Sequence, residues 1–237
     1  MAEPNPYLAD PHWSTAEQVT EAVLRRFPAD VMAVGAHGSS VHRGDTAGSD
    51  VQLLVVTYRP GSGPRPVARR VGGLLVDVAV SGGDELLRQA ATLSPDWPLV
   101  ADRYVNTRPL HDPTDWLTRL RDTHLTRLTA ARNPEFTALA RQAWCRGFSA
   151  HTEASRLAEW YQTDAALLRL SEARLAAATV VGLLTRTYYR SAADAVIRAG
   201  VAGADIRELG TVLARQADEL TARGRPVDGT PDQLFDP

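Results

Sequence analysis

An acid and an amide open one strand-like segment of the chain, and a second acid lies inside another. Asp50 and Gln52 stand at the start of the apolar segment 51–56, and Asp77 lies within the apolar segment 74–80. Residues two apart on a strand share one face of a sheet, so the side chains of Asp50 and Gln52 should point the same way. If the two segments pair as neighbouring strands, all three side chains converge. Mg²⁺ usually binds one or two carboxylates together with substrate phosphates, so these three residues are predicted metal ligands.

A Gly-Ser pair precedes Asp50 by about ten residues. Gly38 and Ser39 follow a short apolar segment and predict a tight turn. Glycine lets the backbone approach a ligand closely, so the N–H groups of such a turn can bind a phosphate. His42 and Ser49 lie between the pair and Asp50, and they are further candidates for contact with a nucleotide.

Each of these residues also has an ordinary structural interpretation. The Gly-Ser pair could form a plain turn, Asp50 could be an acid that faces water, and His42 could be structural or exposed. Gln52 could be a polar spacer in a site that has lost its metal. Asp77 stands between apolar residues, where an unpaired charge would be costly, and this favours a metal-bound or ion-paired carboxylate.

The composition excludes several classes of protein. The net charge is -2 over 237 residues, so no basic field indicates binding to nucleic acid. The one cysteine, Cys145, cannot form an internal disulfide, which fits a reducing cytoplasm. No apolar run approaches the ~20 residues that span a bilayer. We therefore expect a cytoplasmic protein that binds neither nucleic acid nor membrane.

The character of the sequence changes partway along the chain. Residues 1–112 mix short apolar segments with helical ones, and Ser14 to Glu17 reads as the capping box of the first helix. Residues 94–99 read as a compact turn in which Trp97 packs against the core. From 113 the chain reads as helices rich in Ala, Leu and Arg. The sequence thus predicts an α+β protein, with domains over 1–112 and 113–237. The long helices are expected over 135–162, 164–190, 192–199 and 203–223.

The motif of Gly38-Ser39 followed by Ser49-Asp50-Val51-Gln52 resembles the signature of the nucleotidyltransferase superfamily. That signature is Gly-Ser, a spacer of about ten residues, then Asp-x-Asp or Asp-x-Glu. Residues 94–99 and 108–113 resemble the region after the sheet in kanamycin (aminoglycoside 4′) nucleotidyltransferase. The resemblance implies a nucleotidyltransferase-fold mixed sheet with flanking helices, followed by an all-α helical bundle. It also implies transfer of an AMP-type group from ATP or another nucleoside triphosphate to a hydroxyl of an aminoglycoside-like small molecule, with Mg²⁺, in a homodimer with shared active sites.

The same resemblance assigns roles to individual residues. Asp50 and Asp77 match metal-binding acids, and Gly38 with Ser39 matches the turn that holds the triphosphate. The family uses a glutamate on the first long C-terminal helix as the base that removes the acceptor proton. Glu153 matches it after a shift of about three residues, and Glu159 is the second choice.

Two departures from the family pattern leave a second function open. Gln52 stands where the family has Asp or Glu, so it offers an oxygen but no charge, and Mg²⁺ should bind more weakly. The family also has a lysine just after the catalytic glutamate, and the nearest cation in this chain is Arg156. The alternative is a degenerate member that does not transfer nucleotides, acting as a small-molecule-binding protein or as a repurposed biosynthetic enzyme. The sequence leaves antibiotic resistance and antibiotic biosynthesis equally open.

Overall fold

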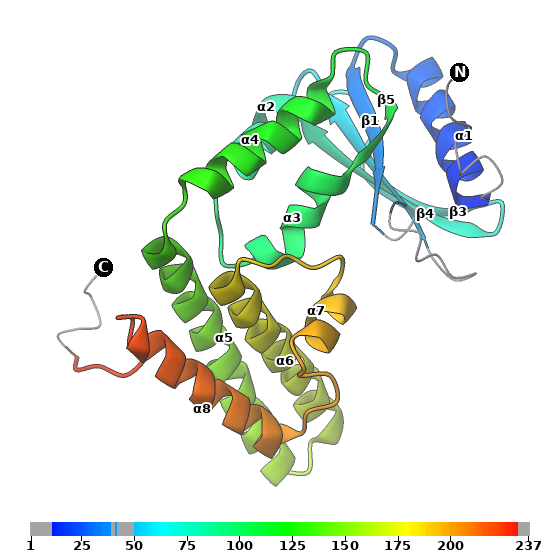
Figure 1. Cartoon of the computed structure of the whole chain (residues 1–237). Coiled ribbons are helices and arrows are strands. Elements are labelled where there is room, and N and C mark those ends of the chain that lie inside the picture. The colour runs from blue at the N-terminus through cyan, green and yellow to red at the C-terminus, as the bar shows by residue number, and fades with distance from the viewer. Residues whose placement is uncertain (1–10, 39–40, 42–49, 232–237) are drawn as a thin grey trace. The chain divides into compact units, whose positions relative to one another are not determined.

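The protein is α+β, with a mixed five-stranded sheet and its helices followed by a helical region (Figure 1). This computed structural model describes residues 11–38, 41 and 50–231. In chain order, the elements are α1 (Pro11–Arg26), β1 (Val31–His37), β2 (Val51–Thr57), β3 (Val67–Val71), β4 (Leu74–Gly82), α2 (Gly83–Ala90), α3 (Trp97–Asn106), β5 (Arg108–His111), α4 (Trp116–Ala130), α5 (Asn133–Glu159), α6 (Thr163–Thr185), α7 (Ala192–Arg198) and α8 (Ile206–Ala222).

The strands are arranged in the order β3-β4-β2-β1-β5. The pair β2–β4 is parallel, and β1–β2, β3–β4 and β1–β5 are antiparallel. The sequence prediction that the segments 51–56 and 74–80 pair as neighbouring strands is therefore confirmed.

One face of the sheet packs against α1. Val51, Leu53 and Val55 alternate along β2 and are fully buried, in one cluster with Trp13 and Ala16 of α1. This alternation is the period of two that a strand imposes on its side chains. Gln52 and Leu54 therefore lie on the opposite face of the sheet. The polar side chain of Gln52 thus points away from the core formed with α1, as predicted.

The predicted capping box at Ser14 to Glu17 is wrong. The helix begins at Pro11, so Ser14 lies inside its first turn, and Glu17 accepts a hydrogen bond from Trp13 Nε1 at 2.9 Å. Proline is favoured at the first position of a helix because its missing N–H would have no partner there. This preference outweighs the Ser-x-x-Glu pattern here.

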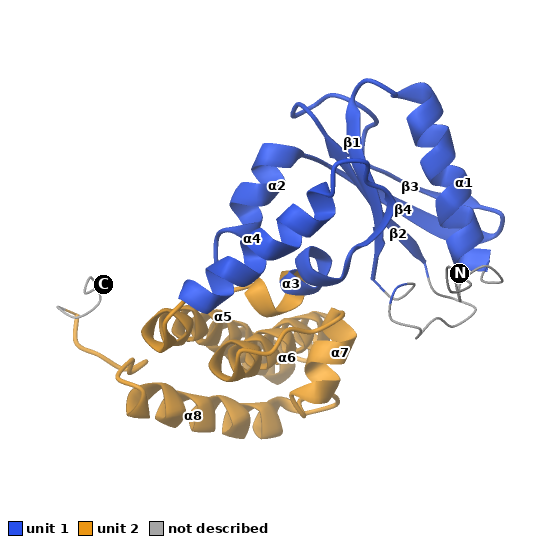
Figure 2. Cartoon of the chain, turned by 45° about the horizontal axis from the view of Figure 1, so that its top comes forward, with its two compact units in different colours: residues 1–93, 101–130 blue, residues 94–100, 131–237 orange. Residues whose placement is uncertain are grey.

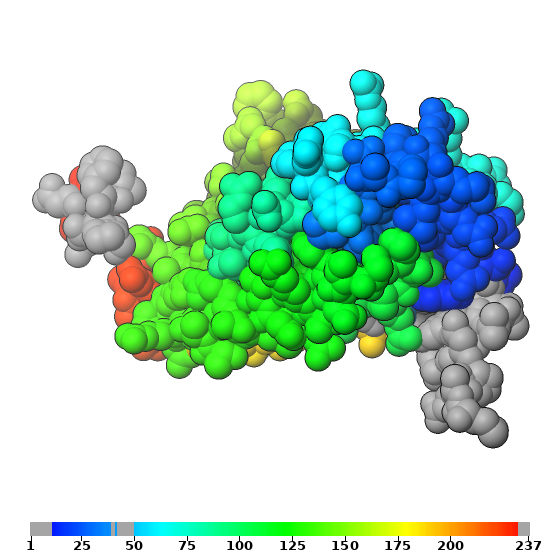
Figure 3. Space-filling model, turned by 90° about the horizontal axis from the view of Figure 1, so that it is seen from above, coloured from blue at the N-terminus to red at the C-terminus, as the bar shows by residue number. Residues whose placement is uncertain are grey.

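The chain divides into two units, coloured separately in Figure 2. The first holds residues 1–93 and 101–130, and the second holds 94–100 and 131–237. The division differs from the predicted domains 1–112 and 113–237, because α4 belongs with the sheet. Trp116, Leu117 and Leu120 on α4 are buried. The other face of α4 forms a continuous part of the surface in Figure 3 (green).

The second unit is built on the long helices α5 and α6, joined by the three residues 160–162. Trp144 Nε1 on α5 donates to the backbone oxygen of Leu213 on α8 at 2.8 Å, and Gln216 Nε2 on α8 donates to that of Ala177 on α6 at 2.9 Å. The four helices expected after residue 133 are present, but α6 ends at Thr185, five residues before the predicted end at 190. None of the helices in the described ranges is both long and apolar enough to cross a lipid bilayer.

His124 on α4 gives the first unit a dependence on pH that can be measured. Its ring is fully buried, Nδ1 donates to the backbone oxygen of Ala90 at 2.9 Å, and burial lowers the pKa of the ring. Below a pH of about 6.5, the ordinary pKa of histidine, His124 binds a proton in the unfolded chain but not in the folded one. Stability is therefore lost as the pH falls below that value.

We expect His124→Asn to weaken this loss, because the amide can keep the hydrogen bond to Ala90 but does not titrate. The measurement is the free energy of unfolding in urea at pH 7.5 and 5.5 for both proteins. All other titratable groups are shared, so an equal loss in the variant would show that His124 does not contribute.

Candidate nucleotide-binding site

A row of polar side chains crosses three strands at one end of the sheet. In the pairing register, Gln52 on β2 faces His37 on β1 on one side and Asp77 on β4 on the other. Register partners in a sheet lie on the same face, about 4.8 Å apart between neighbouring strands. The structure therefore brings Gln52 and Asp77 together, from segments 25 residues apart.

Asp50 joins this row through a hydrogen bond. Gln52 Nε2 donates to Asp50 Oδ2 at 3.2 Å. Asp50 lies just before β2, one position outside the paired register, and Asp77 belongs to the paired part. The two carboxylates therefore lie diagonally across neighbouring strands, with the amide of Gln52 between them.

Gly38 ends β1 in a conformation that favours glycine. Its φ is +76°, and a Cβ placed there would stand 2.5 Å from Oε1 of Gln52. The Gly38 carbonyl accepts from the N–H of Val41 at 3.3 Å, so the chain turns here. A side chain at position 38 would displace the amide that reaches Asp50, which explains why the turn needs glycine.

His37 is neutral at pH 7. Burial and the positive charge of Arg103 lower the pKa of its ring to about 4, against opposing contributions from Asp102 and Asp50. His37 can therefore donate or accept a hydrogen bond in this row but supplies no positive charge to a phosphate.

The predicted metal ligands fit Mg²⁺ in part. Asp77 is exposed and Asp50 is half-buried, so both carboxylates are accessible. This corrects the inference that Asp77 is a buried charge, since its apolar neighbours in the strand point to the other face. In the described ranges no group of three or more His, Cys, Asp or Glu side chains is arranged to hold a metal ion. Gln52 would have to turn its amide over to offer Oε1 beside Asp50, because its Nε2 now faces that carboxylate.

Glu153, the predicted base, belongs to the second unit. Its Oε2 lies 3.0 Å from Nε of Arg169, whose guanidinium also holds Glu172 at 2.6 Å. Glu153 is thus one end of an ion-pair chain between α5 and α6. To accept a proton from a substrate it would first have to leave Arg169. Glu159, the second choice, is exposed at the end of α5.

Ser39, His42 and Ser49 lie outside the residues that the structure describes. Of the predicted nucleotide-binding residues, Gly38 alone is within them. Arg103 is a residue of this region that sequence reasoning missed, because it stands in no motif and no periodic pattern marks it.

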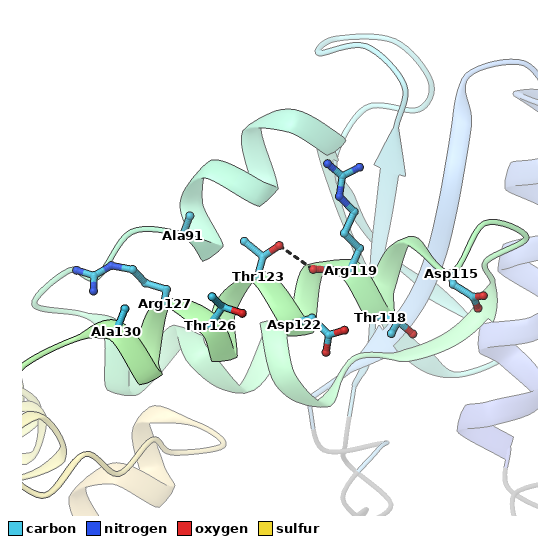
Figure 4. A pocket seen from close by; sticks show the side chains of 9 residues that line it. All are labelled: Ala91, Asp115, Thr118, Arg119, Asp122, Thr123, Thr126, Arg127 and Ala130. Atoms are coloured by element: carbon cyan, nitrogen blue, oxygen red, sulfur yellow. Dashed lines mark hydrogen bonds between the residues drawn. The ribbon is translucent and has the colours of Figure 1, made fainter.

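A surface hollow of about 750 Å³ runs along α4, in a different place from this polar row (Figure 4). It is lined by exposed and half-buried side chains of one face of α4, by Asp115 just before the helix and by Ala91. Thr123 Oγ1 donates within the helix to the carbonyl of Arg119, drawn as a dashed line. No predicted site residue lines this hollow, and its walls come almost wholly from a single helix, so we assign it no ligand.

Comparisons with known proteins give matches among solved structures alone. No protein-family model matches the chain, and no curated protein matches it. Among solved structures, the chain is similar to the crystal structure of a nucleotidyltransferase-like protein from Exiguobacterium sibiricum. The two are 16% identical, the match covers 87% of this chain and 75% of that one, and the TM-score is 0.47. A similarity of this size identifies neither a substrate nor a catalytic residue.

Proposed function

We propose that this protein is a Mg²⁺-dependent nucleotidyltransferase that transfers an AMP-type group from ATP or another nucleoside triphosphate to a hydroxyl of an aminoglycoside-like small molecule. One observation carries the proposal. Asp50 and Asp77 are 27 residues apart in the sequence, yet Asp50 lies directly before β2 and Asp77 lies on β4, the strand beside it, with Gln52 and Asp77 in register.

The proposed chemistry is a displacement at the α-phosphorus. The acceptor oxygen forms a bond to that phosphorus, the bond to the bridging oxygen breaks, and pyrophosphate leaves. Such transfers depend mostly on positioning and on neutralising charge. Gly38 and Ser39 would hold the triphosphate, with His42 and Ser49 beside it. Bound Mg²⁺ would neutralise phosphate charge.

Side chains of the protein would hold that ion and accept the proton. Asp50 and Asp77 would hold Mg²⁺ with the help of Gln52. Glu153 would take the proton of the acceptor hydroxyl after release from Arg169. In the family this base serves the partner's site, so we also propose a homodimer, which the molar mass from light scattering tests directly.

Release of pyrophosphate tests the proposal. The protein is incubated with each of the four common nucleoside triphosphates, Mg²⁺ and a panel of amino-sugar acceptors, and pyrophosphate is measured against a reaction without acceptor. Acceptor-dependent release supports the proposal. No release with any acceptor, together with no binding of nucleotide by calorimetry, would remove it.

The second candidate is a degenerate protein of this type that binds small molecules without transfer. The hydrogen bond from Gln52 to Asp50 favours it, because an amide that donates to a carboxylate occupies the place of a metal between them. Binding of nucleotide that does not depend on Mg²⁺, without pyrophosphate release, would support this candidate.

Gln52→Glu separates the two candidates. Under nucleotidyl transfer, a third carboxylate should tighten binding of Mg²⁺ with ATP about tenfold, since it adds a charge within a few ångström of the ion. Without metal the new carboxylate would stand beside Asp50 and Asp77, so the variant should be less stable than the wild type and should regain stability with Mg²⁺.

Calorimetry of ATP with and without Mg²⁺ and thermal unfolding under both conditions are the measurements. Gln52→Met is the matched control, because it keeps the length of the side chain but offers no oxygen. Equal affinity for Mg²⁺·ATP in Gln52→Glu and the wild type would favour the degenerate protein.

A further inference from the structure

We propose that Arg103 binds the phosphate chain of the nucleotide. Because Gln52 replaces an acid, Mg²⁺ should bind weakly here, and the guanidinium of Arg103 supplies part of the positive charge that the ion would otherwise bring to the phosphates. This inference rests on the proposed function, and it adds a residue of the α3 helix to the nucleotide site.

The last turn of α3 lies on the face of the sheet that carries the polar row. The Thr107 hydroxyl donates to the backbone carbonyl of Arg103, one turn earlier. The methyl group of Thr107 lies against Gly35, where a Cβ would stand 2.3 Å from it. Gly35 and His37 are two apart on β1 and share a face, so the turn that holds Arg103 is beside His37.

Strand pairing also places the turn that holds Arg103 at the end of the sheet that carries the polar row. Arg108, directly after this turn, pairs with Ala36 next to His37. The positive charge of Arg103 contributes to the low pKa of His37, as expected for groups at short range. Gln52 is the register partner of His37, so Arg103 approaches the row from the side of β1 and Asp77 lies on the far side of Gln52.

Arg103 has an N–H that lacks an acceptor. Its Nε is buried and makes no hydrogen bond within the part of the chain that the structure describes. The guanidinium lies 5.5 Å from the centre of the Tyr104 ring. This contact stabilises the charge, but the ring offers no acceptor to the N–H groups, which point outward in the guanidinium plane. The neighbouring acid, Asp102, already accepts from Asn106 Nδ2 at 2.8 Å.

A buried donor without an acceptor is costly, and the side chain of Arg103 as a whole is only half-buried, so a phosphate would meet its guanidinium from the accessible side. Phosphate oxygens suit a guanidinium particularly well, because its planar N–H groups can donate two parallel hydrogen bonds to one phosphate. The chain has no lysine to serve instead. His37 is neutral and supplies no positive charge, whereas the guanidinium of Arg103 beside it has the charge that a polyphosphate requires.

The test measures binding of inorganic tripolyphosphate and of ATP by calorimetry, each with Mg²⁺ and with EDTA. In EDTA the contribution of a bound metal is absent and the contribution of Arg103 remains. We expect Arg103→Gln to weaken tripolyphosphate binding in EDTA about 10- to 100-fold, the effect of losing charge-assisted hydrogen bonds. Arg119→Gln, which removes an equal charge from the exposed face of α4, is the control and should change affinity less than twofold.

Arg103→Lys keeps the charge and removes the planar donor set, so it should bind with intermediate affinity. If Arg103→Gln fails to fold, the affinity of Arg103→Lys for tripolyphosphate is the test of the proposal. Unchanged affinity in a folded Arg103→Gln, or in Arg103→Lys where that variant alone folds, overturns the role of Arg103 and leaves the proposed function standing. If the wild type binds neither tripolyphosphate nor ATP under any of these conditions, both proposals fall.

Discussion

Asp50→Asn is expected to lower the rate of nucleotidyl transfer about 10³-fold or more, while the protein stays folded. Asp50 is the acid to which Gln52 already donates a hydrogen bond, and Gln52 in turn lies against Gly38. Asparagine keeps an acceptor oxygen for Gln52 but removes the charge that would hold a divalent cation. With Gln52 uncharged, Asp77 would be the one remaining acid of the proposed ligand set.

The measurement is the rate of pyrophosphate release at saturating ATP, alongside calorimetry of ATP with Mg²⁺ and with EDTA. We expect the variant to lose the part of ATP affinity that depends on Mg²⁺ and to keep the part measured in EDTA. Asp84→Asn is the control, because Asp84 is an exposed acid in the first turn of α2. A variant with at least a tenth of the wild-type rate would mean that Asp50 holds no catalytic ion.

The polar row was predictable because strands have a period of two. Apolar residues at 51, 53 and 55 require that 50 and 52 face away from the core they build. The apolar segment around Asp77 marked a second strand, and the resemblance placed its acid on a neighbouring strand, but the parallel direction came from the structure. The register that sets Gln52 opposite Asp77 came only from the structure, because pairing register depends on the packing of both faces together.

Other features could not be read from local sequence. Helix α4 follows a Pro-containing turn and reads like the helices after it, but Trp116, Leu117 and Leu120 bury it in the first unit. Its partners come from segments far apart in the chain, so no local pattern reports them.

Arg103 was missed for a similar reason. An arginine in a helix is usually solvated, and what distinguishes this one is a buried Nε without an acceptor. The ion pair from Glu153 to Arg169 joins two helices and was equally invisible. In each case the information lies in tertiary contacts, which override local propensity.

Trp97→Ala should lower the free energy of unfolding of the second unit by about 3–5 kcal/mol, the range for truncating a buried large aromatic residue. Trp97 is 2% exposed, as its predicted packing role requires. Its ring meets the ring of Phe136 edge-on, with centroids 5.4 Å apart, and that of Tyr188 at 6.5 Å. The indole therefore joins segment 94–100 to α5, through Phe136, and to the chain after α6, through Tyr188.

The neighbouring backbone shows why this space cannot close after truncation. The N–H of Tyr189 donates to the carbonyl of Pro98 at 2.7 Å, and a Cβ at Gly182 would stand 2.7 Å from Cβ of Pro98. These contacts fix segment 94–100 against α6 and the chain after it. A loss of the ring therefore leaves a cavity, and the cost of a cavity adds to the lost burial.

Urea unfolding followed by circular dichroism measures the effect, with Trp160→Ala as the matched control. Trp160 is 68% exposed, so the same chemical change there should alter stability by about 0.5 kcal/mol or less. If the two units unfold separately, Trp97→Ala should shift the transition of the second unit and leave that of the first in place. Equal losses in the two variants would show that Trp97 does not anchor segment 94–100, and the assignment of that segment to the helical unit would then lack its main energetic support.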